Sequence, residues 1–173
     1  MNRRDMIRQM GLGYGAIVAM PVWANGWNQS TLPKNGFLDK ESLKSLTAIA
    51  DTFIPEGKKE PGAVSLQVDQ FLDRLFANCY ETAEQEKIKS GLEALNLQAR
   101  RSFGQDFEKC TQTQREGLLS ALGTSGSGAD KWFYDTLRRE TIRGYTTSEY
   151  VMVNHYDYVM APGFYEGCVD VEN

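Results

Sequence analysis

The fold class is decided by residues 43–55, which read LKSLTAIADTFIP. Apolar side chains recur there every three or four positions, at Leu43, Leu46, Ile49, Ala50 and Phe53. Because an α-helix turns once in 3.6 residues, this spacing places them on one face. Asp39 is suited to cap the first turn, and Pro55 cannot continue the helix. We therefore predict an amphipathic helix that buries one face.

Four further segments show the same helical spacing. The second runs from about residue 63 to residue 80, and the third runs from a Thr82 cap to Gly104. The fourth follows a capping box at 111–114, and the fifth runs from an Asp130 cap to residue 144 or 145. No segment before residue 147 alternates with a period of two. We therefore predict an all-α fold with a single domain of about five main helices.

Each predicted helix also carries apolar residues that we expect to be buried. They are Val64, Val68, Phe71, Leu72, Leu75 and Phe76 in the second helix, Ile88, Leu92, Leu95, Ala99 and Phe103 in the third, Leu118, Leu119 and Leu122 in the fourth, and Trp132, Phe133, Leu137 and Ile142 in the fifth.

The first 24 residues have the layout of a twin-arginine export signal. Arg3 and Arg4 precede an apolar, glycine-rich run at 10–20, and Ala24 offers a cleavage site. The run is too short for a membrane-spanning helix, which needs about 20 apolar residues. We expect export of a folded protein to the periplasm, and whether the signal is cleaved at Ala24 stays open.

The rest of the chain divides into a linker at 25–36, a helical domain at 37–146 and a C-terminal tail at 147–173. The tail is rich in aromatic residues and glycine, and we predict that it is irregular. A segment this aromatic either folds back over the helices or docks on another protein, since a tyrosine ring combines a large apolar area with a polar group. The candidate docking residues are Tyr150, Tyr156, Tyr158, Phe164 and Tyr165.

The composition argues against nucleic-acid binding, because the chain has a formal net charge of −4 and no basic stripe. Three cysteines are present, Cys79, Cys110 and Cys168, and an odd number leaves at least one thiol unpaired within the chain. We interpret them as buried small side chains in preference to a disulfide, and a pairing cannot be deduced. The single histidine, His155, is interpreted as a surface or structural residue.

No catalytic, cofactor-binding or metal-ligating motif is found in the sequence. Asp69 and Asp73 lie four residues apart, but adjacent Arg74 favours a solvated or salt-bridged helix face over acid–base chemistry. The fifth helix has a basic side. Because Asp135 and Glu140 balance part of its charge, we interpret it as a mixed, solvated face in preference to a site for an acidic partner or phosphate. The basic residues are Lys131, Arg138, Arg139 and Arg143.

Five segments in order resemble the gluconate 2-dehydrogenase subunit 3 family. They read LKSLTAIADTFIP at 43–55, VDQFLDRL at 68–75, GLEAL at 91–95 with later Phe103, Gly104 and Phe107, QREGLL at 114–119, and WFYDTLRRETIRGY at 132–145. Amphipathic helices resemble one another, so the order of all five carries the resemblance. The end of the chain, PGFYEGC at 162–168, is also similar to tails of this family.

The resemblance implies a small subunit of a membrane-associated sugar dehydrogenase complex. Its partner would be a flavoprotein of the glucose–methanol–choline type, which holds FAD and the sugar, and a c-type cytochrome would accept electrons. The small subunit would carry the export signal for both chains, so that the flavoprotein, which lacks a signal, crosses the membrane folded and bound to it through the twin-arginine translocase. The family supplies no catalytic residue. The alternative is a free-standing periplasmic helical protein that binds a small ligand; an enzyme acting alone ranks third.

Overall fold

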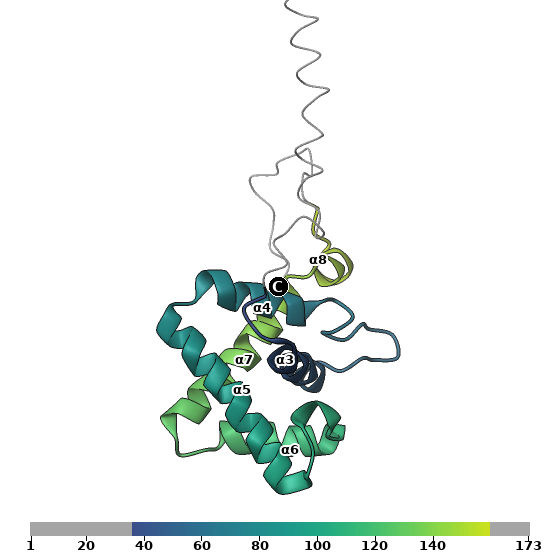
Figure 1. Cartoon of the computed structure of the whole chain (residues 1–173). Coiled ribbons are helices and arrows are strands. Elements are labelled where there is room, and N and C mark those ends of the chain that lie inside the picture. The colour runs from purple at the N-terminus through teal and green to yellow at the C-terminus, as the bar shows by residue number, and fades with distance from the viewer. Residues whose placement is uncertain (1–35, 160–173) are drawn as a thin grey trace, which may run out of the picture. The chain divides into compact units, whose positions relative to one another are not determined.

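The computed structural model describes residues 36–159 of the chain, and these residues contain helices and turns but no β-strand (Figure 1). The predicted all-α class is therefore confirmed. The export signal and nearly all of the linker precede the described residues, and the tail beyond residue 159 follows them. The elements are α3 (Lys40–Phe53), α4 (Val68–Cys79), α5 (Thr82–Phe103), the 3₁₀ turn η2 (Phe107–Lys109), α6 (Gln112–Gly123), α7 (Gly128–Thr146) and α8 (Glu149–His155).

Helix α3 forms as the sequence predicts. The Asp39 side chain accepts a hydrogen bond from the Glu41 N–H (3.2 Å), which satisfies one of the free donors of the first turn. The last hydrogen bond joins the Ile54 N–H to the Ala50 carbonyl, directly before Pro55. Leu46 and Ile49 are fully buried along the predicted apolar face.

Helix α4 begins at Val68, five residues after the predicted start. Gln67 has a left-handed backbone (φ 57°), which interrupts the helix, and residues 63–67 form turns. Within α4 only the positions that repeat every four residues are fully covered, namely Val68, Leu72 and Phe76. The predictions that Val64 and Phe71 are buried are wrong: Val64 lies in the turn before α4, Phe71 lies to the side of the narrow stripe, and both are exposed.

The other helix ends lie close to the predictions. Helix α5 begins with a capping box between Glu81 and Glu84, so the cap lies one residue before Thr82. It ends at Gly104, whose φ of 71° a residue with a side chain would adopt only at a cost. The predicted capping box at 111–114 begins α6. The cap of α7 is Ser127, which accepts from the Asp130 N–H.

Helix α7 packs against α3, α4, α5, α6 and α8, and is thus the central element of the core. Phe133 and Leu137 are buried on it as predicted, whereas Ile142 is 43% exposed on its opposite face, so that prediction is wrong. The same holds for Phe103 at the end of α5, which is 41% exposed. Helix α8 lies at one end of the bundle and α6 at the other (Figure 1).

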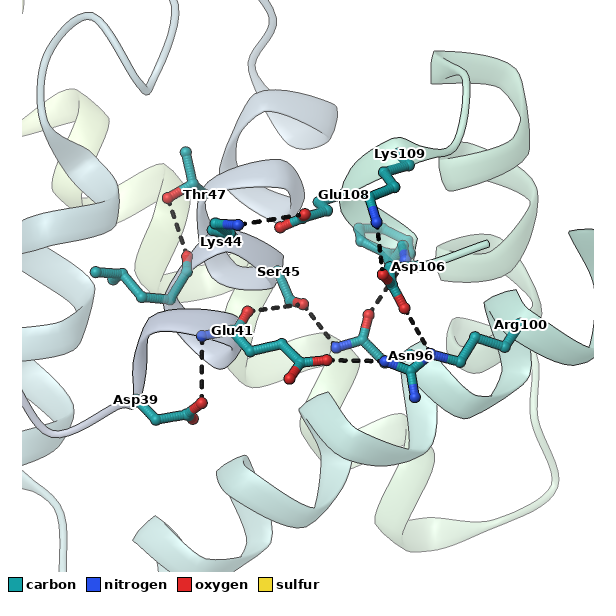
Figure 2. A network of polar contacts seen from close by, with 12 residues as sticks. Asp39, Glu41, Lys44, Ser45, Thr47, Asn96, Arg100, Asp106, Glu108 and Lys109 are labelled. Atoms are coloured by element: carbon teal, nitrogen blue, oxygen red, sulfur yellow. Dashed lines mark hydrogen bonds and ion pairs between the residues drawn. The ribbon is translucent and has the colours of Figure 1, made fainter. Parts of the chain in front are cut away.

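A buried amide joins α3, α5 and η2 (Figure 2). Asn96 donates from Nδ2 to Ser45 Oγ (2.7 Å), and its Oδ1 accepts the Phe107 N–H (3.2 Å). Beside it, Arg100 forms ion pairs with Glu41 and Asp106. The hydrogen bond from Arg100 holds the pKa of the Asp106 carboxyl below its usual value, although screening by water limits the effect on stability. The network positions Phe107, whose ring is fully buried.

Candidate docking site

Helix α8 is a short element inside the segment that the sequence predicts to be irregular. Ser148 caps it by accepting a hydrogen bond from the Val151 N–H (3.4 Å). The Val151 side chain is buried, and α8 packs against α7. A helix of seven residues is not stable alone, so these tertiary contacts are the reason that it forms.

The loop between α3 and α4 provides the surface on which the start of the C-terminal segment is anchored. Tyr145 donates from its hydroxyl to the Pro61 carbonyl (3.0 Å), and Tyr150 donates to Glu60 Oε2 (3.0 Å). His155 Nε2 lies 3.2 Å from the same carboxylate oxygen. The hydrogen bond to the Glu60 carboxylate raises the pKa of Tyr150, because it favours the protonated phenol. Two contacts from α8, by Tyr150 and His155, and one from the end of α7, by Tyr145, thus join this segment to the loop.

Apolar side chains remain uncovered on the outer side of α8 and just beyond it. Four residues within a stretch of seven are between 49% and 62% exposed. A single exposed apolar residue is ordinary on a protein surface, whereas several within a few residues of one another are a candidate contact surface. We call this group the C-terminal apolar patch; it consists of Val153, Tyr156, Tyr158 and Val159.

The structure separates the predicted docking residues into three groups. Tyr156 and Tyr158 belong to the C-terminal apolar patch. Tyr150 is half-buried and bonded to Glu60, so its hydroxyl serves the chain's own fold. Phe164 and Tyr165 lie outside the described residues, as do Arg3 and Arg4 of the predicted export signal.

Sequence reasoning missed Val153, Val159 and Glu60. The two valines could have been found, because they are apolar residues within the segment proposed for docking. Glu60 gives no such signal, since its partner Tyr150 is 90 residues away.

A groove of about 580 Å³ lies between α5, the end of α6 and the start of α7. Small residues form much of its wall, and Gly91 allows the Phe133 ring to approach α5 closely. At its edge, the Lys87 ammonium lies 5.4 Å from the centre of the Trp132 ring, a cation–π distance. The groove is large enough for a small ligand. Its lining residues include Ser90, Gly91, Ala94, Leu122, Ala129 and Trp132.

The acidic pair of α4 has a structural role. Asp73 is buried and accepts the Leu38 N–H (3.0 Å), whereas Asp69 accepts the Thr47 hydroxyl (2.8 Å). The interpretation of a solvated or salt-bridged face is therefore wrong for Asp73. The pair fastens the start of the described chain and α3 to α4.

Glu140 of α7 is buried, although the sequence predicted it to be on a solvated face. Its carboxylate is buried and accepts hydrogen bonds from Tyr80 (3.1 Å), Arg139 (2.9 Å) and Arg143 (3.3 Å). Burial raises the pKa of the Tyr80 phenol, because it disfavours the phenolate. Glu140 is therefore not part of the solvated, mixed-charge face that the sequence predicted for it.

The cysteines and the histidine follow the predictions in part. Cys110 is buried as expected, but Cys79 is exposed at the end of α4, and Cys168 lies outside the described residues. His155 is on the surface, as predicted. Among residues 36–159 no three side chains of the metal-binding types lie close enough to hold an ion. No helix in that range has the length and apolar character that crossing a bilayer requires.

Comparison with protein families identifies a relationship. The model of the family described as gluconate 2-dehydrogenase subunit 3 matches residues 40–163, which is more than half of the chain and spans every helix from α3 to α8. Neither the curated proteins nor the solved structures yield a match. The matched range contains all five segments on which the resemblance was based. This chain belongs to the gluconate 2-dehydrogenase subunit 3 family.

Proposed function

We propose that this chain is the non-catalytic small subunit of a periplasmic, FAD-dependent sugar or gluconate dehydrogenase complex. It binds and stabilises a flavoprotein of the glucose–methanol–choline type and escorts it, folded, through the twin-arginine translocase. FAD and the oxidation of the sugar belong to the flavoprotein, and a c-type cytochrome is a candidate third subunit. The observation that carries the proposal is the family match across α3–α8, because the family is named as a dehydrogenase subunit.

The arrangement of α8 supports a docking role for the C-terminal segment. Contacts of Tyr150 and His155 with Glu60, in the loop between α3 and α4, hold α8 in place. The C-terminal apolar patch then faces outward from a fixed support. Aromatic residues at such positions contribute strongly to protein interfaces, because a rigid ring buries a large area at a small cost in conformational entropy.

Replacing Arg3 and Arg4 together with lysine tests the escort role. We expect dehydrogenase activity of the complex to fall to background in the periplasmic fraction and to remain in the cytoplasm, because the translocase reads the arginine pair. The measurement is flavoprotein-dependent sugar oxidation in the two fractions. Arg8→Lys is the matched control, since Arg8 is basic but outside the pair. Undiminished periplasmic activity in the double variant would refute the escort role.

Truncation of the chain tests the docking role. Ending the chain after Thr146 removes α8 and the rest of the tail, and should abolish co-purification with the flavoprotein. Ending it after His155 retains α8 but removes Tyr156 and Tyr158, and should weaken co-purification strongly. Circular dichroism should show that the helices persist in the second variant. Phe103→Ser, which changes an exposed ring on α5, is the control. Full retention by both truncated chains contradicts docking through the tail.

A free-standing periplasmic ligand-binding protein is the second candidate, and the groove lined by Gly91 and Trp132 favours it. Size-exclusion chromatography of the chain expressed alone distinguishes the two functions. A monodisperse monomer that binds a sugar supports ligand binding. Aggregation that co-expression with the flavoprotein relieves supports the subunit function.

A further inference from the structure

The outward face of α7 carries an unbalanced group of positive charges. Residues three, four and seven positions apart on a helix share a side, so the exposed residues 131, 135, 138, 139 and 142 line one face. We call this the α7 outward face, and it is bordered by Arg143. Its charged members are Lys131, Asp135, Arg138, Arg139 and Arg143.

The Glu140 carboxylate is buried beneath this face and offsets part of its positive charge, because it forms ion pairs with Arg139 and Arg143. The carboxylate points into the protein and fixes the Arg139 and Arg143 guanidinium groups, whose side chains are still 64% and 61% exposed. Each arginine uses only part of its five donors in these bonds. Both therefore present oriented guanidinium groups to the outside.

The remaining charges of the face are not neutralised by neighbours. Among residues 36–159, no acidic side chain lies within 4.0 Å of the Lys131 or Arg138 charge, and Asp135 forms no ion pair. Four cations against the two carboxylates of Asp135 and Glu140 leave a net charge of +2 on this side of α7, whereas the formal net charge of the chain is −4. Such local reversal of charge is a basis for electrostatic attraction of a negatively charged partner.

We propose that the α7 outward face docks on an acidic surface of the flavoprotein subunit. This inference rests on the proposed function, because it requires a partner subunit. Ile142 lies at the C-terminal end of the face, beside the arginines at 138, 139 and 143, and its exposed side chain adds apolar area next to their charges. Arginine is enriched at protein interfaces, since its planar fork matches a carboxylate with two hydrogen bonds.

A protein surface fits this face better than an anionic membrane. A helix that lies in a membrane surface needs a broad apolar side, whereas Ile142 is the single apolar residue among the outward positions. Asp135, which shares the face, would also be repelled by anionic headgroups. Oriented arginines beside one carboxylate instead suit a partner that presents carboxylates with a matching gap.

The test is the affinity between the separately purified full chain and the FAD flavoprotein at about 0.02 M and about 0.5 M salt, where charges are weakly and strongly screened. The test variant is Lys131→Glu/Arg138→Glu. These two residues are chosen because in the wild-type structure neither has an ion-pair partner in the described part of the chain. We expect at least about tenfold weaker binding at low salt and a shallower dependence on salt. Lys40→Glu/Arg101→Glu is the matched control, because it changes the formal charge equally on α3 and α5 and should bind like the wild type.

The outcomes separate this inference from the proposed function. Wild-type binding that both double variants retain, or that both lose equally, overturns docking through α7 and leaves the subunit function standing. Failure of the wild-type chain to bind the flavoprotein overturns both. Salt-dependent binding to vesicles of phosphatidylglycerol that Lys131→Glu/Arg138→Glu abolishes, with flavoprotein binding unchanged, would assign the face to a membrane and also overturn the inference. Matched thermal unfolding of the variants excludes loss of fold.

Discussion

Phe107→Ala should lower the free energy of unfolding by about 3–5 kcal/mol, the usual loss when a fully buried phenylalanine is removed from a core. The ring is 0% exposed, and η2 holds it against α3 and α5. Because the Phe107 N–H is bonded to Asn96 and the 3₁₀ turn is tied down by ion pairs, the backbone cannot collapse to fill the space. The cavity term therefore adds to the lost hydrophobic transfer energy.

Phe103→Ala is the matched control, because it removes the same ring four residues earlier in the chain. That ring is 41% exposed, so we expect a loss of about 0.5 kcal/mol. Urea denaturation of the full chain measures the free energy of unfolding of both variants. The slope of this free energy against urea concentration should be similar, since both variants expose nearly the same surface on unfolding. Equal losses for the two variants would show that the two rings are equally buried in solution.

Gly91→Val should destabilise the fold by about 3 kcal/mol, the upper end of the usual cost of overpacking. A Cβ atom at Gly91 would overlap the Phe133 ring, which is itself buried. The change would force α5 and α7 apart at the groove. A fall in the midpoint of thermal unfolding measures the effect.

Gly117→Ala provides the opposite control within a helix. Nothing lies within 4 Å of a Cβ atom at Gly117, which is exposed in α6. Replacing an unstrained helical glycine with alanine stabilises a protein by about 0.5–1 kcal/mol, because alanine restricts the unfolded chain. If Gly91→Ala stabilised the chain as Gly117→Ala does, the close approach of Phe133 to α5 would be refuted.

The ends of the helices were largely predictable, because the residues that start and stop a helix act on neighbouring backbone groups. Asp39, Gly104 and the capping box at 111–114 act as expected. The errors are of two kinds. The caps of α5 and α7 differ from the predicted residues because another suitable residue precedes them: Glu81 caps α5 and Ser127 caps α7. The start of α4 moved because Gln67 adopts a left-handed backbone, which the sequence does not signal.

The choice of buried apolar residues was less predictable. Helical spacing identified Leu72, Phe76, Leu92 and Leu137 correctly, since they lie at the centre of each apolar stripe. Residues at the margins, such as Phe71, Phe103 and Ile142, are covered only if a neighbouring helix passes over them. The crossing of helices depends on the whole bundle, and no local pattern encodes it.

The candidate docking site could also be predicted only in part. Tyr156 and Tyr158 could be proposed from sequence, because an aromatic segment outside the helical pattern is visible in the residues themselves. Helix α8 could not be predicted from sequence, because so short a helix is stable only when Val151 is buried and Tyr150 is bonded to Glu60.

By itself, the sequence determined the helical class and the approximate number and order of the helices, because hydrophobic spacing and caps are properties of neighbouring residues. Only the tertiary structure decided that Glu140 turns inward beneath two arginines and that Glu60 fastens α8. Glu140 also accepts a hydrogen bond from Tyr80, 60 positions away, and Glu60 accepts one from Tyr150, 90 positions away; both form only when packing brings distant segments together. Which charged side chains of α7 face outward is thus decided by the fold.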